Sequence, residues 1–473
     1  MNKIENPIIP TKQIFYDINK KEIIAWDNIH KEVLDLKAIA TFCALGFMLD
    51  EDTFFKKIKV LKPSKTYYLD EAKMIVNEEE SWKWHYSPRN IHFNVCLDEF
   101  SDLFENFINK KINNRKIILP MSGGLDSRTL FIPIKDKNDL VLCSYEFEGG
   151  ISETNTAKEL SEMYKLPLYT KTIQKGYLWN QINNLYGFNR CFTDFTHPRQ
   201  LDAISEWKNM ADAVLLGHWG DVLFDEQINS HTISYEEQLN KLKGKILKKS
   251  GINLAQDLWA CWGIEGSFIS YITERLNELY KEINIDHPSA KIRAFKSKYW
   301  APRWTSINSS LFNILGEPIY PYYSNEICKF ICTVPEEYLK GRKIQIEYIK
   351  KNCSRVASIP WQQVYPLNLN NYKLFNSPQY YLLRIIKKIV RIMGSYYLDT
   401  PKLVTRNWEL QFLGEYNFIR LQELLLKSSE NNNFIPKSIF IDYLEKFKGN
   451  PIKYAHAICM LLTLAIFSDK HLK

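Results

Sequence analysis

Residues 116–131 read KIILPMSGGLDSRTLF, and this stretch decides the fold. The run from Lys116 to Met121 is short, apolar and closely followed by glycine, which is typical of a buried parallel strand. The glycine pair after it predicts a tight turn, and the residues beyond predict a helix. Where a strand, a glycine turn and a helix follow one another, free backbone N–H groups converge on an anion. The stretch therefore predicts a phosphate-binding loop at the end of a strand.

The residue types inside this loop suit a bound polyphosphate. Gly123 and Gly124 allow close backbone approach and unusual backbone angles. The hydroxyl groups of Ser122 and Ser127 can donate hydrogen bonds, and the carboxylate of Asp126 can hold a magnesium ion that neutralises phosphates. The loop is neither a Walker loop, because no Lys-Ser or Lys-Thr pair follows the glycines, nor a GxGxxG turn. The alternative is an ordinary Gly-Gly helix start.

Strand-like and helix-like segments alternate around the loop. A helical pattern over Leu97–Ile112 precedes it, and further strands are predicted at Leu140–Tyr145 and Ala213–Gly217, with a helix at Glu153–Tyr164. Strands that alternate with helices indicate a parallel α/β sheet. From about Tyr235 onward helical periodicity dominates, so we expect a helical region packed on the α/β core.

Three segments together resemble the asparagine synthetase family. The SGGLDS string, Ser122 to Ser127, is similar to that family's pyrophosphatase loop, which binds ATP and releases pyrophosphate. Leu216 to Phe224, LGHWGDVLF, looks like the second family signature, a strand end followed by a glycine-rich turn and an aspartate. Phe147-Glu148-Gly149 followed by Ser152-Glu153 is similar to the family segment after the second strand.

The resemblance implies a fold, a reaction and a site. The fold is an α/β parallel-sheet PP-loop ATP pyrophosphatase domain (adenine nucleotide alpha-hydrolase-like), with a helical C-terminal region and a small α+β N-terminal domain. The enzyme would be an ATP-dependent carbon–nitrogen ligase that adenylates a carboxylate, forms AMP and pyrophosphate, and transfers ammonia or an amine. Asp126 and Asp221 would hold Mg²⁺. ATP would be bound by Met121, Ser122, Gly123, Gly124, Asp126, Ser127, Tyr145 and Gly217.

The first 94 residues resemble only the final part of the family's glutaminase domain. Thr41–Leu49 and Thr53–Pro63 run as the last helix and strands of that domain do. Such a glutaminase needs an N-terminal cysteine thiolate as nucleophile, whereas this sequence starts Met1-Asn2. We therefore expect no glutamine hydrolysis by this chain, and a separate glutaminase or another ammonia source. The expected domains are a truncated glutaminase-like unit at 1–94, an ATP-binding domain at 95–365 and its helical extension at 366–473.

Two departures from the family bear on the chemistry. His218 stands where the resemblance implies a glutamate, and the family's C-terminal lysine has no counterpart among Trp361 to Leu369. An imidazole with a pKa near neutrality suits proton transfer, so His218, with Asp221, is a candidate catalytic residue acting on the attacking amine. The alternative is a hydrogen-bonded structural histidine. Weaker candidates, each either a buried or surface structural residue or a substrate contact, are Arg128, Arg199 and Arg303.

The composition restricts the class of protein. With 45% hydrophobic residues among 473, the chain can bury a large core. The net charge of +8 is spread along the chain, and local basic residues such as Arg342 and Lys343 suit a solvated helix face as well as phosphates. The nine cysteines form no CxxC pair, which favours free thiols in a reducing compartment. The longest apolar run, Ala457–Phe467, is shorter than the ~18 residues of a membrane span. We expect a cytoplasmic protein without membrane contact.

Two other functions remain open. PP-loops also serve tRNA-modifying enzymes and the chain is basic, but no RNA-binding module is recognisable. A non-catalytic nucleotide-binding protein is the second alternative, because the cysteine is missing and His218 replaces a glutamate. Retention of both Asp126 and Asp221 counts against it. The sequence identifies the substrates only as a small-molecule or peptide carboxylate and an amine.

Overall fold

A five-stranded parallel sheet carries the predicted loop. The computed structural model describes residues 2–29, 32–228, 233–385, 404–432 and 434–472. Within them the sheet has the order β11-β10-β7-β8-β9, with every neighbouring pair parallel. The α/β class with a parallel sheet is thus confirmed. The strands are β7 (Ile117–Pro120), β8 (Leu140–Phe147), β9 (Leu168–Ile173), β10 (Ala213–Leu215) and β11 (Glu317–Ile319).

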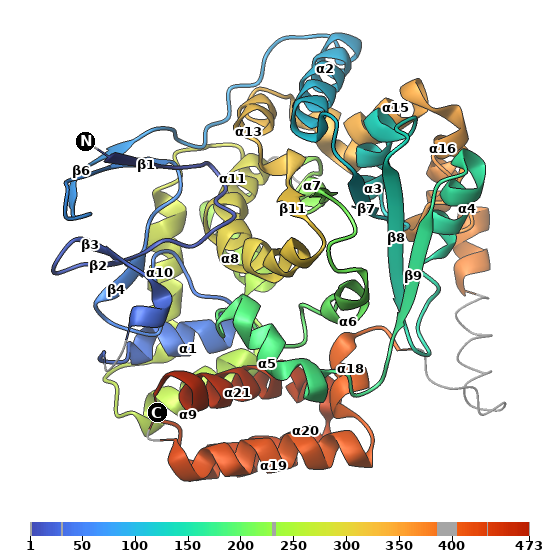
Figure 1. The fold of residues 1–473 in the computed structure, drawn as a ribbon. Helices are drawn as coiled ribbons and strands as arrows, with labels where there is room; N and C mark the ends of the chain where they lie inside the picture. The colour runs from blue at the N-terminus through green and yellow to red at the C-terminus, as the bar shows by residue number, and fades with distance from the viewer. Residues whose placement is uncertain (1, 30–31, 229–232, 386–403, 433, 473) are drawn as a thin grey trace.

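The strand order places the loop where the chain reverses its direction across the sheet. From β7 the chain moves outward to β8 and β9 (Figure 1). It then returns to form β10 on the other side of β7, followed by β11. Ligands of open α/β sheets bind beyond the carboxyl ends of the strands at such a reversal. Here that place lies between the ends of β7 and β10.

Two strands of the sheet, β9 and β11, are absent from the sequence predictions. β11 falls in the stretch after Tyr235, where helical periodicity dominates and no strand is predicted. The helical C-terminal region is confirmed, but the sequence pattern does not reveal this strand. β11 is an edge strand, and its Pro318 lacks a backbone donor, a feature tolerated only at a sheet edge and opposed to a strand pattern. β9 forms the other edge, and its mostly exposed and half-buried residues show no clean alternation.

Helices enclose this sheet in a shared apolar core. The first of them, α2, shows the sequence cause: Phe100, Phe104 and Ile108 recur every four residues, lie on one face and are fully buried. Residues of α2, β7, β8, α3, α13 and α15 belong to one buried cluster. The helices are α2 (Phe93–Ile112), α3 (Leu125–Phe131), α4 (Asn155–Tyr164), α13 (Asn325–Ile331), α14 (Glu336–Leu339), α15 (Lys343–Asn352) and α16 (Ser354–Ser358).

The N-terminal region is a small α+β unit of two antiparallel sheets and one helix. The helix α1 (Leu36–Leu45) begins at Asp35, whose side chain accepts from Ala38 N, and ends at Gly46 with φ 84°. These are the N-cap and C-cap types that the sequence favours. One sheet has the order β1 (Asn2–Asn6), β5 (Lys65–Leu69), β6 (Ile75–Glu80), and the other β3 (Glu22–Ile24), β2 (Phe15–Asp17), β4 (Ile58–Val60).

The remaining helices include those that bring the N-terminal and C-terminal parts of the chain into one core. α1 packs against α9, and His456 Nε2 of α21 donates to the Cys43 carbonyl of α1 (2.9 Å). The rings of Phe54 and Phe467 stack with centroids 3.8 Å apart. Figure 1 shows α21, α20 and α19 as a layer at the bottom, beside α1 and α9. The helices of this part are α5 (Leu178–Asn189), α6 (Leu201–Ile204), α7 (Gly220–Leu223), α8 (Tyr235–Ile246), α9 (Lys249–Cys261), α10 (Phe268–Lys281), α11 (Pro288–Phe295), α12 (Ser306–Ser309), α18 (Asn407–Phe412), α19 (Glu415–Asn431), α20 (Lys437–Gly449) and α21 (Pro451–His471).

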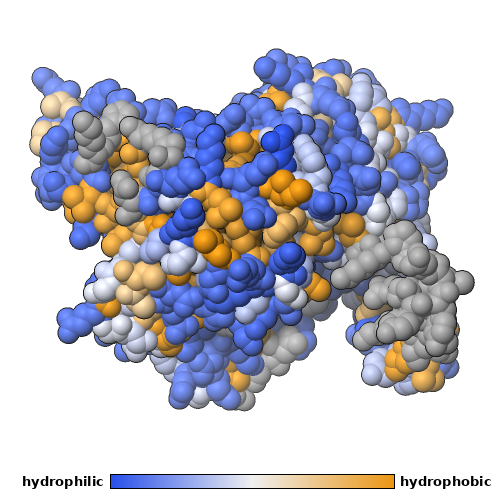
Figure 2. Space-filling view, turned by 90° about the horizontal axis from the view of Figure 1, so that it is seen from below, coloured by the Kyte–Doolittle hydropathy of each residue, from blue (hydrophilic) through white to orange (hydrophobic). Residues whose placement is uncertain are grey.

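The helix α21 is the one long apolar helix of the described residues. By length and composition it could cross a membrane, but 72% of its apolar stretch is buried inside the protein. It therefore packs as a core helix, as expected for Ala457–Phe467. On the face seen from below, hydrophilic residues predominate and hydrophobic residues gather in patches between them (Figure 2).

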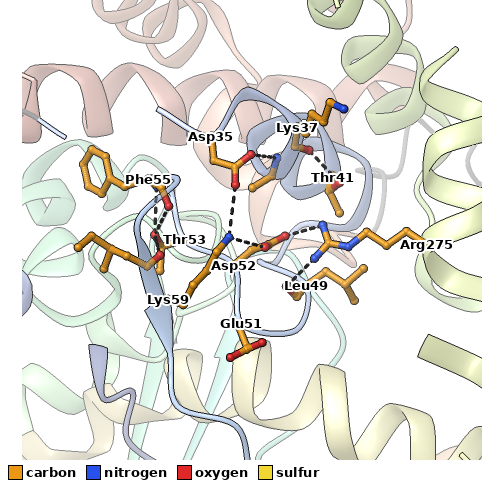
Figure 3. A network of polar contacts seen from close by, with 12 residues as sticks. Asp35, Lys37, Thr41, Leu49, Glu51, Asp52, Thr53, Phe55, Lys59 and Arg275 are labelled. Atoms are coloured by element: carbon orange, nitrogen blue, oxygen red, sulfur yellow. Dashed lines mark hydrogen bonds and ion pairs between the residues drawn. The ribbon is translucent and has the colours of Figure 1, made fainter. Parts of the chain in front are cut away.

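A buried ionic network fastens the N-terminal unit to the helical region (Figure 3). The carboxylate of Asp52 pairs with Arg275 of α10 (2.5 Å) and with Lys59 (3.1 Å). Arg303 donates to the Asp52 carbonyl (2.5 Å), and Asp35 pairs with Lys59 (3.4 Å). Burial favours a raised pKa for the Asp52 carboxyl, but Arg275 and Lys59 outweigh it, so the net pKa is lowered. A charged Asp52 therefore stabilises the fold at neutral pH.

We expect Asp52→Asn to lower the free energy of unfolding at pH 7 by about 3–5 kcal/mol, because it leaves Arg275 buried without a counter-charge. A carboxyl with a lowered pKa stabilises above its unfolded pKa and loses that effect as pH falls, so the deficit should shrink below about pH 4. Urea unfolding at pH 7 and below about pH 4 measures the difference in the free energy of unfolding between the variant and wild type. The exposed pair Arg89–Glu99 supplies the control: Arg89→Met should cost less than about 1 kcal/mol. Equal effects of the two variants would contradict the network's role.

Candidate active site

The loop between β7 and α3 is held in one shape by its own serines. Ser122 N donates to Ser127 Oγ (3.2 Å), and that hydroxyl donates to the Ser122 carbonyl (3.2 Å). Gly124 N donates to Ser122 Oγ (3.3 Å). A tie to β8 comes from Ser144, whose Oγ donates to the carbonyl of Met121 (2.8 Å). The loop is thus ordered in advance, which reduces the entropy lost when a ligand binds.

The turn after β10 packs directly against this loop. A Cβ atom at Gly217 would lie 3.2 Å from Asp126 Cβ, and one at Gly220 would lie 2.1 Å from Asp126 Oδ1. Glycine alone permits an approach of this kind. Asp221 follows Gly220 at the start of α7, and burial together with the negative charge of Asp221 raises the pKa of the Asp126 carboxyl. The two aspartates predicted to hold magnesium are therefore neighbours in space.

A half-buried ion pair neutralises the loop's carboxylate. Arg342 Nη2 pairs with Asp126 Oδ1, and Gln345 Nε2 donates to the same oxygen (3.0 Å) and to the hydroxyl of Tyr322 (3.0 Å). Arg342 has a left-handed backbone (φ 63°) after Gly341 (φ 62°), a conformation that costs arginine about 1–2 kcal/mol. Burial favours a lower pKa for Arg342, but Asp126 outweighs it and the net pKa is raised. The sequence marks Arg342 only as part of a basic cluster, so its place in the site comes from the structure.

A cavity of about 430 Å³ opens at the loop and the second turn, a size common among small-molecule sites. Gly123 and Gly124 shape the loop but are not among the residues that line the cavity. Eight of the ten residues predicted for the site do line it: Met121, Ser122, Asp126, Ser127, Tyr145, Gly217, His218 and Asp221.

His218 lines this cavity and has a nitrogen without a hydrogen-bond partner among the described residues. This nitrogen, the Nδ1 atom, is buried. Burial lowers the pKa of His218 to about 4, and the positive charge of Arg199 adds to the lowering. The imidazole is therefore neutral at pH 7, free to accept or donate a hydrogen bond to a ligand but weakly basic.

A π-helix, η4 (Lys296–Thr305), supplies a wall of the cavity that sequence reasoning misses. Lys296, Trp300 and Trp304 are spaced by four residues, and all three line the cavity. Lys296 Nζ lies 5.3 Å from the Trp300 ring centre and 5.7 Å from that of Trp219, and burial lowers the pKa of Lys296 to about 8. The KxxxWxxxW spacing is visible in the sequence, but it also fits the buried face of an ordinary α-helix. Rare π-helical turns are frequent at functional sites.

Arg128 supports the loop from behind. It is fully buried, and its guanidinium donates to the carbonyls of Ile359 (2.9 Å), Gly123 (3.4 Å) and Pro360. Gln362 N also donates to the Gly123 carbonyl (3.3 Å), and a Cβ at Gly123 would lie 2.6 Å from Gln362 Cβ. Arg128 thus ties the segment 359–362 to the loop as a buried structural residue.

The other two arginine candidates differ in position. Arg199 stands over the Phe147 ring, 5.5 Å from its centre, and its Nε is buried without a partner among the described residues. Arg303 belongs to the ionic network at Asp52 and does not line the cavity. Arg199 does not line the cavity either, but it interacts with Tyr145 and Glu153, which do. It therefore stays a candidate substrate contact, whereas Arg303 is a structural residue.

The donor set suits magnesium bound to a nucleotide better than a free metal ion. No group of three or more His, Cys, Asp or Glu side chains in the described ranges could hold a metal by itself. Magnesium is commonly held by one or two carboxylates, with substrate phosphates and waters completing its shell. The adjacent carboxylates of Asp126 and Asp221, beside an ordered loop and a cavity, match that requirement.

No known family model and no curated protein matches this chain. The parallel sheet, the loop and the residues that meet at the cavity are therefore the features that indicate its function.

The contact between the two glycine turns gives a direct test of this geometry. We expect Gly220→Ala to lower the free energy of unfolding by about 1–3 kcal/mol, because its Cβ would overlap the Asp126 carboxylate. Gly244 of α8 is the matched control, since no atom lies within 4 Å of a Cβ there. Gly244→Ala should be neutral or stabilising by up to about 1 kcal/mol. Urea unfolding of both variants measures the difference, and equal stabilities would refute the close approach.

Proposed function

We propose that this chain is an ATP-dependent amide ligase with a PP-loop fold of the asparagine synthetase type. It would adenylate a carboxylate, release pyrophosphate and pass the acyl group to ammonia or an amine. One observation carries the proposal: the SGGLDS loop after β7 and the turn after β10 meet so closely that Asp126 and Asp221 lie together at a cavity. The strand order, which puts this place at the reversal of the sheet, supports it.

The chain's own groups suit each part of ATP. The hydroxyls and backbone of the loop residues Ser122, Gly124 and Ser127 would receive the phosphates. Asp126 and Asp221 would hold Mg²⁺, which supplies charge neutralisation to the departing pyrophosphate when bound. Tyr145, at the end of β8 and on the cavity wall, would lie beside the adenine.

Two positive groups flank the carboxylates and suit the same anion. Arg342 pairs with Asp126, and Lys296 lies near enough to Asp221 for that carboxylate to oppose the lowering of its pKa by burial. A guanidinium and an ammonium in a sheltered cavity stabilise developing negative charge more strongly than they would in water. They would hold pyrophosphate as it leaves.

The part of the cavity away from the loop would receive the carboxylate and the amine. Trp300, Trp304 and Phe312 make that wall aromatic, while His218 and Gln200 add polar atoms. The buried Nε1 of Trp300, Oε1 of Gln200 and Nδ1 of His218 all lack partners within the described residues. Buried polar atoms are normally satisfied, so these three suit a bound substrate, a small molecule or a peptide. The assignment of His218 as general base stays a prediction.

Replacing either aspartate should abolish pyrophosphate release while the fold stays intact. Asp126→Asn and Asp221→Asn keep the side-chain volume but remove the charge that magnesium requires. Pyrophosphate release is measured with Mg·ATP against a panel of carboxylic acids, starting with L-aspartate, L-glutamate and N-acetyl-L-aspartate. Asp98→Asn, at an exposed ion pair with Lys351, is the control and should keep full turnover. Unchanged turnover in either site variant would remove that residue from the proposed site.

Glutamine should not serve as a nitrogen source for the isolated chain. The first 94 residues resemble only the end of a glutaminase domain, and their one cysteine, Cys43, is fully buried. Burial raises the pKa of the Cys43 thiol, so it supplies no thiolate nucleophile. Ammonium chloride should support amide formation where glutamine does not. Release of ammonia from glutamine by the pure protein would contradict the prediction.

A further inference from the structure

A histidine and a buried aspartate form a pair outside the predicted site. His197 Nδ1 is hydrogen-bonded to Asp194 Oδ2, and the other oxygen, Oδ1, accepts from Thr196 Oγ1 (2.6 Å), Thr196 N (2.8 Å) and His197 N (3.1 Å). The Asp194 side chain is 1% exposed, whereas that of His197 is 40% exposed. The carboxylate is thus fixed from several directions, and the imidazole it holds reaches solvent.

This geometry selects the tautomer of the histidine. An Nδ1–H that donates to a carboxylate leaves Nε2 as a proton acceptor, and the carboxylate stabilises the imidazolium that forms after proton uptake. Burial favours a raised pKa for the Asp194 carboxyl, but His197 and Thr196 outweigh it and the net pKa is lowered, so Asp194 is an anion. No residue in the described ranges hydrogen-bonds to His197 Nε2.

The pair stands at the edge of the cavity. The ring of His197 meets that of Trp304 edge-on, with centroids 4.8 Å apart, and Trp304 lines the cavity. Gln200, three residues beyond His197, lines it as well. A substrate that enters along η4 and the segment 194–200 would pass the exposed imidazole before it reaches the loop.

The groups around the Asp194–His197 pair leave the histidine able to accept a proton. From α21, His456 faces Asp194, and burial lowers the pKa of His456 to about 4, so it is neutral. Cys459 of α21 is hydrogen-bonded to Thr196 Oγ1 (3.5 Å), and burial keeps its thiol protonated. Lys248, just before α9, adds a positive charge near Asp194. Among these groups only His197 combines exposure with a fixed anionic partner.

We propose that His197, oriented by Asp194, is the general base that takes the proton from the amine nucleophile, a role that rests on the proposed ligase function. The amine nitrogen attacks the carbonyl carbon of the acyl adenylate, a C–N bond forms, the C–O bond to the phosphate breaks and AMP leaves. The nitrogen's proton passes to His197 Nε2 and from there to solvent. In this proposal His197 takes the general-base role that the sequence predicts for His218, and His218 serves as a neutral hydrogen-bonding group in the cavity wall.

The test separates the two half-reactions in His197→Gln and Asp194→Asn. The probes are the carboxylic acid of the panel above that gives the fastest ATP–pyrophosphate exchange, with ammonium chloride or hydroxylamine as nucleophile. We expect exchange within about twofold of wild type and amide formation from ammonium slowed roughly 10²–10⁴-fold. Hydroxylamine is unprotonated at neutral pH and needs little help from a base, so hydroxamate formation should be nearly retained.

A control variant and a folding measurement distinguish failure of the His197 role from failure of the ligase proposal. His85 is half-buried and does not line the cavity, so His85→Gln should match wild type. Thermal unfolding verifies that each variant folds, with His197→Gln deciding if Asp194→Asn does not. Equal slowing with both nucleophiles, or undiminished amide formation in His197→Gln, overturns the role of the pair while exchange still supports the ligase. Absence of exchange in the wild-type chain with every probe overturns the ligase and this role with it.

Discussion

The near-contact of two glycine turns is the constraint on which the site depends. β7 and β10 are neighbours, so the turns after them must share one small space, and a Cβ at Gly220 would overlap the Asp126 carboxylate. Without side chains at Gly217 and Gly220 the two turns close on each other, and the carboxylates of Asp126 and Asp221 become neighbours. The two carboxylates repel each other at this short range, and Arg342 reduces the repulsion by pairing with Asp126. The arrangement of charge at the cavity thus follows from backbone geometry.

Each element that faces this place adds a group of a different kind. The loop after β7 offers hydroxyls and backbone N–H groups, α15 offers Gln345 with Arg342 just before it, and η4 offers Lys296 between tryptophan rings. Mutually attracting groups from three parts of the chain hold each other in place, so the site is ordered by its own interactions. The aromatic wall lowers the local dielectric, which strengthens every charge interaction inside.

The features that could be predicted from the sequence are those set by neighbouring residues. The strand, glycine turn and helix around Ser122 to Ser127 follow from local pattern, and the second turn at Gly217 follows in the same way. Arg342 could not be found like this, because it lies 216 residues from Asp126 and its helix-face pattern is that of any basic surface. The short strand β11 was hidden by Pro318, and the wall made by η4 by a spacing that fits a common α-helix. In these three cases, contacts between residues far apart in the sequence determine the structure.

The stacking of Phe54 on Phe467 delays completion of the N-terminal core while the chain is being synthesised on the ribosome. The N-terminal unit is made before α21, the helix that packs on its core. At ordinary rates of translation the two rings emerge on the order of tens of seconds apart. During that interval the apolar face of α1 waits without α21. Folding of the first unit is thereby coupled to the synthesis of α21, and a chaperone that shields α1 would be most needed when this chain is made quickly.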